Sequence, residues 1–149
     1  MPATTSTAKT LNVLLVEDNP GDVRLITEAL SEIDLPHNLV VAGDGREALD
    51  LLFPKAEDPP VVCPDLILLD LHLPRKSGKE VLAAVKGAAV LRTIPVVMLT
   101  TSSSHADVMA TYGLHANAYV TKSQDLDRFL QVLALTTRFW LSAVTLPVR

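Results

Sequence analysis

Residues 66–78 read LILLDLHLPRKSG, in which an apolar run ends at the carboxylate of Asp70 and is followed by Pro74 and Gly78. An uninterrupted apolar run is typical of a strand that is buried on both faces of a parallel sheet. Open parallel sheets carry their functional residues at the carboxyl ends of their strands. Asp70 is therefore the first residue of this chain that requires a functional explanation.

Similar apolar segments occur on both sides of this stretch, and a helical pattern follows each of them. We predict strands at residues 11–16, 38–42, 65–70, 96–99 and 117–121. Capping signals open the intervening helices, namely Asn19 with Pro20, Asp44, Ser77 and the hydroxyl run 100–104. Gly113 is expected to stop the fourth helix. Strands that alternate with helices in this way predict an α/β protein with a five-stranded parallel sheet and helices on both faces.

The length and composition indicate one domain. A chain of 149 residues with 48% apolar content can bury a substantial core. We expect a disordered tail at residues 1–10 and a domain at residues 11–149, in which residues 136–149 extend an apolar final helix to about Leu146. The single cysteine, Cys63, excludes an internal disulfide.

Charge and hydropathy exclude several partners. The net charge of −4 and the lack of a basic run disfavour nucleic-acid binding. Residues 1–10 lack the apolar core of a signal peptide, and the apolar runs are shorter than a membrane span. We therefore expect a cytoplasmic protein with neither a nucleic-acid nor a membrane partner.

Polar side chains collect where the predicted strands end. These residues are Glu17, Asp18, Asp70, Thr100, Thr101 and Lys122. The carboxyl ends of parallel strands lie on one edge, so these groups should converge, and clustered carboxylates need a cation to offset their repulsion. An all-oxygen ligand set suits Mg²⁺. A carboxylate beside Mg²⁺ can attack phosphorus and become an aspartyl phosphate, with Lys122 and Thr100 stabilising the phosphoryl oxygens.

In this order the motifs resemble those of the response-regulator receiver family. The matching segments are LLVEDNP at 14–20, DLILLDLHLP at 65–74 with Gly78, PVVMLT at 95–100 and YVTK at 119–122. The resemblance covers roughly residues 11 to 135 and implies a doubly wound, flavodoxin-like (βα)5 fold.

The same resemblance implies a role for each matching residue. Asp70 would be the phosphoacceptor, Asp18 a direct Mg²⁺ ligand, and Glu17 a ligand directly or through water. The backbone carbonyl of His72 would be a further Mg²⁺ ligand. Thr100 and Lys122 would contact the phosphoryl group, and Thr100 with Tyr119 would form a conformational switch. Tyr119 could equally be an ordinary half-buried aromatic residue.

A finer similarity is to the stand-alone response regulators of phytochrome-type histidine kinases. It is carried by EDNPGDVRL at 17–25, LTTSS at 99–103, LHANAY at 114–119 and RFWL at 138–141. It implies that a histidine kinase phosphorylates Asp70 and that the output is a protein–protein interaction or a change of dimer. The chain would catalyse only its own phosphorylation and dephosphorylation.

Other function classes share part of this pattern. A phosphorelay intermediate without an output of its own would carry the same motifs. An Asp-nucleophile phosphohydrolase usually has a second acid two residues after the nucleophile, where this chain has His72. A dinucleotide-binding domain needs a glycine-rich loop after Val16, and none is present.

The residue after Lys122 departs from the family pattern. Most receivers have a proline there, usually with a cis bond, but this chain has Ser123. Because a non-proline cis bond costs about 2.5–4 kcal/mol, we expect the Lys122–Ser123 bond to be trans. Alternatively, Ser123 helps to cap the last helix.

The last helix carries two apolar stripes. One consists of Leu126, Leu130, Leu133, Leu141 and Val144, and the other of Phe129, Val132, Phe139 and Leu146. One stripe can pack on the sheet, whereas the other, with Trp140 nearby, would be exposed on a monomer. We therefore expect a homodimer whose interface includes Phe129, Val132, Phe139 and Trp140. The alternative is that this segment folds back over its own domain.

Overall fold

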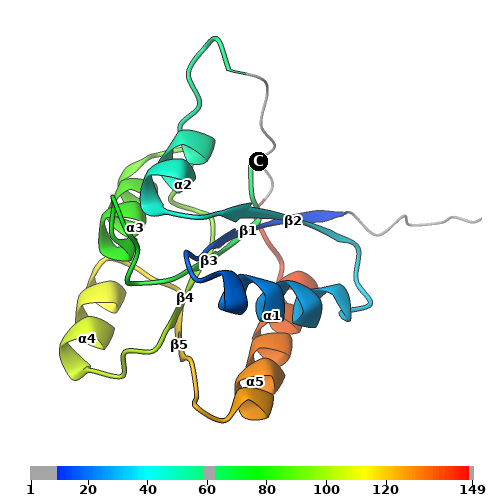
Figure 1. Ribbon diagram of the computed structural model, residues 1–149. Helices are drawn as coiled ribbons and strands as arrows, with labels where there is room; N and C mark the ends of the chain where they lie inside the picture. The colour runs from blue at the N-terminus through cyan, green and yellow to red at the C-terminus, as the bar shows by residue number, and fades with distance from the viewer. Residues whose placement is uncertain (1–9, 59–62, 148–149) are drawn as a thin grey trace, which may run out of the picture.

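The computed structural model describes residues 10–58 and 63–147, and it confirms the expected α/β architecture (Figure 1). The strands are β1 (Leu11–Val16), β2 (His37–Ala42), β3 (Leu66–Leu69), β4 (Val96–Thr100) and β5 (Ala118–Thr121). The helices are α1 (Pro20–Ser31), α2 (Gly45–Leu52), α3 (Gly78–Gly87), α4 (His105–Gly113) and α5 (Leu126–Arg138), and a π-helical turn, η1, covers Phe139–Ala143. Of the tail expected at residues 1–10, residues 1–9 lie outside the described residues, as do residues 59–62 and 148–149.

The strands form one parallel sheet in the order β2-β1-β3-β4-β5. Val16 lies beside Leu69 in the register of β1 and β3, so the residues that follow them, Glu17 and Asp70, leave the sheet side by side. Thr100 lies beside Thr121 in the register of β4 and β5, which places Lys122 at the same edge. The register therefore gathers the strand-end residues as the sequence predicted.

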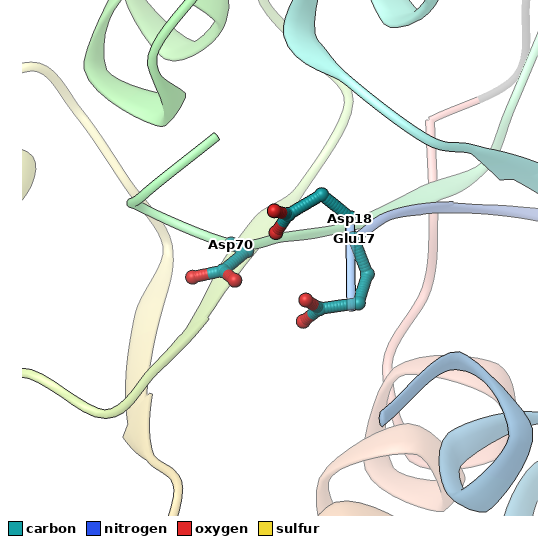
Figure 2. Close-up of side chains that lie close together, drawn as sticks. All are labelled: Glu17, Asp18 and Asp70. Carbon is teal, nitrogen blue, oxygen red and sulfur yellow. The ribbon is translucent and has the colours of Figure 1, made fainter. Parts of the chain in front are cut away.

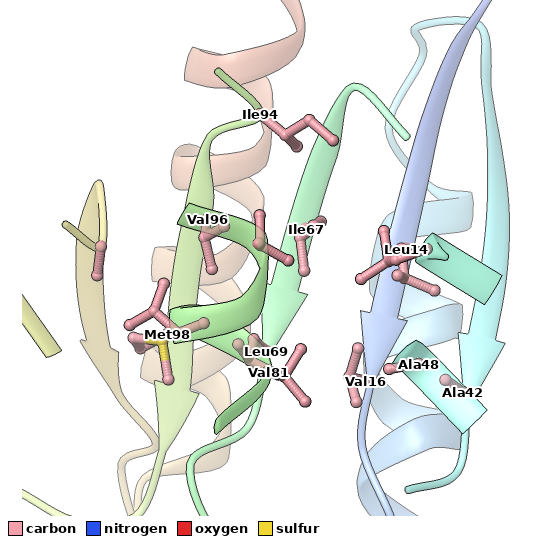
Figure 3. Close-up of a cluster of buried hydrophobic side chains, with 14 of the residues drawn as sticks. Leu14, Val16, Ala42, Ala48, Ile67, Leu69, Val81, Ile94, Val96 and Met98 are labelled. Atoms are coloured by element: carbon pink, nitrogen blue, oxygen red, sulfur yellow. The ribbon is translucent and has the colours of Figure 1, made fainter. Parts of the chain in front are cut away.

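Alternation along the buried strands builds a core on each face of the sheet. Leu14 and Val16 pack with Ala48 of α2 and Val81 of α3, as Figure 3 shows, and Leu82 belongs to the same cluster. Val13 and Leu15 face the opposite layer, which contains α1 and α5. Each fully buried Leu or Val contributes about 1.5–3 kcal/mol, so these two layers supply the framework that holds the strand ends in place.

The helices begin at the capping residues that the sequence indicated. The side chains of Asn19, Asp44, Ser77 and Ser104 each accept a hydrogen bond from a backbone N–H in the following turn. Helix α4 ends at Gly113 as expected, but the residue with left-handed backbone after it is His115, whose φ is 72°.

The last helix differs from the prediction in its length and in its buried face. Regular α-helix ends at Arg138, and the π-helical turn ends at Ala143, short of Leu146. Phe129 is only 5% exposed, and Trp140 packs against the same core cluster. The prediction that Phe129 belongs to an exposed interface stripe is therefore wrong, because positions 129, 133 and 137 form the face that packs on the sheet.

The peptide bond between Lys122 and Ser123 was predicted to be trans. No cis peptide bond occurs among the described residues, so the Lys122–Ser123 bond is trans as expected. The Ser123 hydroxyl also accepts a hydrogen bond from the Asp125 N–H at 3.0 Å, just ahead of α5.

Within the described part of the chain, no helix has both the length and the apolarity that a membrane span requires.

Candidate functional site

Three carboxylates meet at the carboxyl edge of the sheet. Glu17 and Asp18 follow β1, Asp70 follows β3, and one carboxylate oxygen from each lies within 4.8 Å of the others (Figure 2). Glu17 and Asp70 are buried, whereas Asp18 is exposed. The Asp70 side chain also accepts a hydrogen bond from the His72 N–H at 3.3 Å, which holds the loop after β3 close to the site.

Lys122 places a positive charge beside this cluster. Its Nζ lies 2.5 Å from Glu17 Oε2 and 3.4 Å from Asp70 Oδ2, and its side chain is 8% exposed. A third partner was missed by the sequence reasoning: Asp22 Oδ2 accepts a hydrogen bond from the same ammonium group at 3.0 Å. The available signal was an acidic residue in the first turn of α1, one helical turn beyond Asp18.

The electrostatics of the site favour a bound cation. The pKa of Glu17 is raised to about 7, mainly by burial, with the hydrogen bond from Lys122 opposing the rise and the charge of Asp70 adding to it. For Lys122, burial alone lowers the pKa, but hydrogen bonds to Glu17 and Asp22 and the charge of Asp70 more than offset it and raise the pKa. The ammonium group therefore stays charged, and the acids around it still outnumber it.

Thr100 and Tyr119 occupy the positions expected of them. Thr100 is fully buried at the end of β4, and its hydroxyl oxygen accepts a hydrogen bond from the Ser102 N–H at 3.2 Å. The Tyr119 hydroxyl donates a hydrogen bond to the Ser102 carbonyl at 2.8 Å, and burial raises the pKa of Tyr119. The loop after β4 is thus attached both to the site residue Thr100 and to the aromatic residue of β5.

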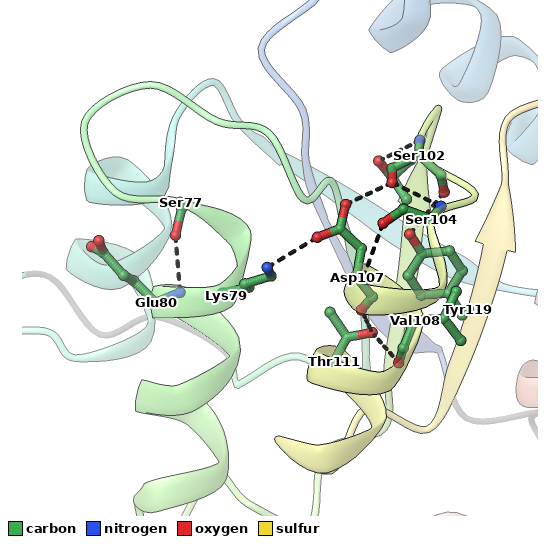
Figure 4. Close-up of polar contacts among 10 residues, drawn as sticks. Ser77, Lys79, Glu80, Ser102, Ser104, Asp107, Val108, Thr111 and Tyr119 are labelled. Atoms are coloured by element: carbon green, nitrogen blue, oxygen red, sulfur yellow. Dashed lines mark hydrogen bonds and ion pairs between the residues drawn. The ribbon is translucent and has the colours of Figure 1, made fainter.

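A polar network continues from this loop to α3, as Figure 4 shows. The Ser102 hydroxyl donates to Asp107 Oδ2 at 2.6 Å, and Lys79 Nζ donates to Asp107 Oδ1 at 3.0 Å. The hydrogen bond from Ser102, followed by that from Lys79, lowers the pKa of Asp107 to about 2. The sequence reasoning did not identify this link, because Lys79 and Asp107 belong to different helices.

Two glycines, at the starts of α2 and α3, lie too close to the backbone of the segment after β3 to carry a side chain. A Cβ at Gly78 would lie 2.2 Å from the Asp70 carbonyl oxygen, and one at Gly45 would lie 1.8 Å from the Lys76 carbonyl oxygen. In the segment between β3 and α3, Arg75 has a left-handed backbone with a φ of 71°. The two glycines therefore allow the loop to pass close to Asp70 and to the start of α2.

The parallel sheet and the acidic strand ends define a response regulator receiver domain. The family model of that name matches residues 13–134, and the chain belongs to this family. It is 45% identical to the response regulator Rcp1 of Synechocystis sp. over 135 residues, which are 91% of this chain and 92% of that protein. The chain is therefore a response regulator of two-component signalling with a flavodoxin-like fold.

Two solved structures extend the comparison. The phosphorylated cyanobacterial phytochrome response regulator RcpA is 46% identical, with a TM-score of 0.89 and coverage of 94% of this chain and 100% of that chain. The bacteriophytochrome response regulator AtBRR is 40% identical, with a TM-score of 0.72 and coverage of 95% of this chain and 99% of that chain.

The acidic cluster fits a divalent cation. Its donors are all carboxylate oxygens, and hard cations prefer such ligands. A crystal structure of Rcp1 is of the Mn²⁺-bound form; that chain is 44% identical, with a TM-score of 0.88 and coverage of 93% of this chain and 99% of that chain.

Proposed function

We propose that this chain signals by accepting a phosphoryl group on Asp70 from the phosphohistidine of a histidine kinase, with Mg²⁺ bound at the acidic cluster. The observation that carries the proposal is the arrangement of Glu17, Asp18 and Asp70 within 4.8 Å, with Lys122 Nζ 3.4 Å from Asp70. Glu17, Asp18, Asp70 and the backbone carbonyl of His72 would hold the ion. When bound, Mg²⁺ neutralises negative charge on the carboxylates and on the phosphoryl oxygens.

The chemistry of the chain's own residues follows from their positions. A carboxylate oxygen of Asp70 attacks phosphorus, the phosphorus–nitrogen bond breaks, and the kinase imidazole keeps the electron pair. Lys122 remains protonated because its pKa is raised, so it can donate a hydrogen bond to a phosphoryl oxygen. The Thr100 hydroxyl supplies a second donor. Hydrolysis reverses the change when water attacks phosphorus and the carboxylate of Asp70 leaves.

We further propose that phosphorylation alters the surface through Thr100 and Tyr119. Support comes from the loop after β4, where Ser102 is hydrogen-bonded to both residues. A rotation of Thr100 toward a phosphoryl group would release or displace Ser102, and the Tyr119 hydroxyl would follow. In this proposal the chain acts on partners and has no enzymatic activity beyond its own phosphorylation and dephosphorylation.

The similarity to RcpA and AtBRR supports a phytochrome-type histidine kinase as the phosphoryl donor.

We propose a homodimer through the last helix as part of the output. Phe129 is buried in the core and is therefore not part of the proposed interface. Phe139 is 49% exposed and Val132 and Trp140 are half-buried, so these three residues can form it.

Intact-mass measurement with Mg²⁺ and acetyl phosphate tests the central proposal. The wild-type protein should gain the mass of one phosphoryl group, and Asp70→Asn should gain none. Asp50→Asn is the matched control, because Asp50 is an exposed acid on α2 whose side chain is 64% exposed. Equal phosphorylation of Asp70→Asn and wild-type protein would overturn the proposal.

A further inference from the structure

The ammonium group of Lys122 has no hydrogen-bond donor to spare. A lysine carries three N–H donors. The structure gives Lys122 a carboxylate for each of them, at 2.5 Å from Glu17, 3.0 Å from Asp22 and 3.4 Å from Asp70. After phosphoryl transfer Asp70 is no longer a free carboxylate, so the donor that faces it can pass to a phosphoryl oxygen. Lys122 can turn a second donor toward the phosphoryl group only if Glu17 or Asp22 loses its own hydrogen bond.

Of Glu17 and Asp22, Asp22 can be released from Lys122 at the lower cost. Its side chain is 35% exposed, compared with 1% for Glu17, the other carboxylate that stays ionised after phosphoryl transfer. A buried charge that loses its partner is far more costly than one that water can solvate. The released carboxylate of Asp22 also stays in the first turn of α1, where the helix dipole favours negative charge.

The space around Asp22 permits this release. A surface pocket of about 320 Å³ adjoins it. The pocket is lined by the polar side chains of Asp22, Thr101, Lys122, Ser123 and Gln124 and by three apolar residues, Leu25, Leu126 and Phe129. Each water occupies about 30 Å³ in the liquid, so the pocket has room for several waters around the freed carboxylate. Asp22 is also absent from the cluster of described carboxylates that can share a cation.

We propose, on the basis of the function proposed above, that Asp22 is a positioning residue that restrains Lys122 in the unphosphorylated state. Its contact with Lys122 is present before phosphoryl transfer and is given up afterwards. An interaction made in only one of two states shifts the equilibrium toward that state. Asp22 therefore opposes the phosphorylated form, and its removal favours that form.

Beryllofluoride, which mimics a phosphoryl group on a carboxylate, provides the probe in the presence of saturating Mg²⁺. Asp22→Ala should bind beryllofluoride about fivefold more tightly than wild-type protein, as expected for an ion pair of about 1 kcal/mol. Asp22→Glu, which keeps the carboxylate, should restore an affinity close to that of wild-type protein. Calorimetric titration measures all three affinities, and a titration with Mg²⁺ alone should show no such gain for Asp22→Ala.

Glu28→Gln is the matched control, because it removes an exposed negative charge from the same helix and Glu28 makes no ion pair with Lys122. It should bind beryllofluoride as wild-type protein does. Asp22→Ala should keep its fold, because Asn19 caps α1 through the backbone N–H of Asp22 and not through its side chain. Thermal unfolding checks this.

The outcomes separate the two proposals. Suppose that wild-type protein binds beryllofluoride and Asp70→Asn does not. Unchanged or weaker binding by Asp22→Ala would then overturn only the role of Asp22. Equal binding by wild-type protein and Asp70→Asn, or no binding by wild-type protein, would overturn the phosphoacceptor proposal and this one with it.

Discussion

Glu17 is a carboxylate whose side chain is 1% exposed and whose pKa is raised to about 7. Burial is the main cause, and the charge of Asp70 adds to it, whereas Lys122 only partly compensates. Ionised Glu17 is therefore an unfavourable group in the metal-free fold. A bound cation would remove this disadvantage, so the same residue that weakens the free protein favours metal binding.

The first prediction concerns the pH dependence of stability without metal. The folded-state pKa of Glu17 lies above its ordinary value of 4.5, so the folded protein binds this proton more tightly than the unfolded chain does. The contribution of Glu17 to stability is greatest at low pH and is lost as the pH rises from 4.5 to about 7. The total loss is on the order of 3 kcal/mol.

Urea unfolding in EDTA at about pH 5 and pH 8 measures this loss. Wild-type protein should lose more free energy of unfolding between the two conditions than Glu17→Gln does, and adding Mg²⁺ at the higher pH should reduce the loss. Glu28→Gln controls for the removal of an exposed acid. Parallel behaviour of wild-type protein and Glu17→Gln would contradict the prediction.

At the scale of elements, the connection from β3 to α3 determines how Asp70 is presented. Gly78 is the first residue of α3, and its backbone lies against the Asp70 and Leu71 carbonyls. Lys79, in the same turn, pairs with Asp107 of α4. The start of α3 therefore contacts the phosphoacceptor strand on one side and the loop after β4, through Asp107 and Ser102, on the other.

The second prediction is that Gly78→Ala destabilises the fold and impairs phosphorylation. The added Cβ would lie 2.2 Å from the Asp70 carbonyl oxygen, so the loop or the strand end must move. Overpacking of this kind costs about 1–3 kcal/mol. Urea unfolding should show this loss, and intact-mass measurement should show less phosphorylated protein than wild type under the same conditions.

Gly87→Ala is the matched control, because Gly87 ends the same helix and a Cβ there would have no neighbour within 4 Å. Its φ is not in the left-handed region. This variant should be as stable as wild-type protein or more stable by up to about 1 kcal/mol. Equal stability of Gly78→Ala and Gly87→Ala would show that the loop accommodates the methyl group.

At the scale of the whole molecule, the last helix both completes the core and leaves apolar surface. Phe129 and Leu133 are buried beside the sheet, and the π-helical turn brings Trp140 and Leu141 against the same cluster. Leu135 and Phe139 are nevertheless 70% and 49% exposed. Exposed apolar side chains gathered on one element favour association with a partner surface.

The third prediction is that wild-type protein forms a dimer that Phe139→Ser weakens. Light scattering at micromolar concentration, with and without beryllofluoride and Mg²⁺, should show a lower average mass for the variant. Val90→Ser is the control, because Val90 is 75% exposed and lies outside the last helix. A wild-type protein that is monomeric in both conditions would contradict the homodimer.

Much of the fold and the core of the site could be predicted from the sequence. The strands are buried on both faces, so their apolar runs are continuous, and the caps are local signals that involve neighbouring residues. Glu17, Asp70 and Lys122 could be placed together without coordinates, because parallel strands end at one edge of the sheet. Their contacts confirm this placement, whereas their roles in phosphoryl transfer remain predictions.

The sequence by itself determined that the LILL run at residues 66–69 is a buried strand, that Asp70 follows it, and therefore at which edge of the sheet the site lies. Only the tertiary structure decided that Asp22 contacts Lys122, 100 residues away, and that Phe129 faces the core. The physical reason is that periodicity fixes the faces of a helix, whereas the neighbours in space decide which face is buried and which side chains become partners.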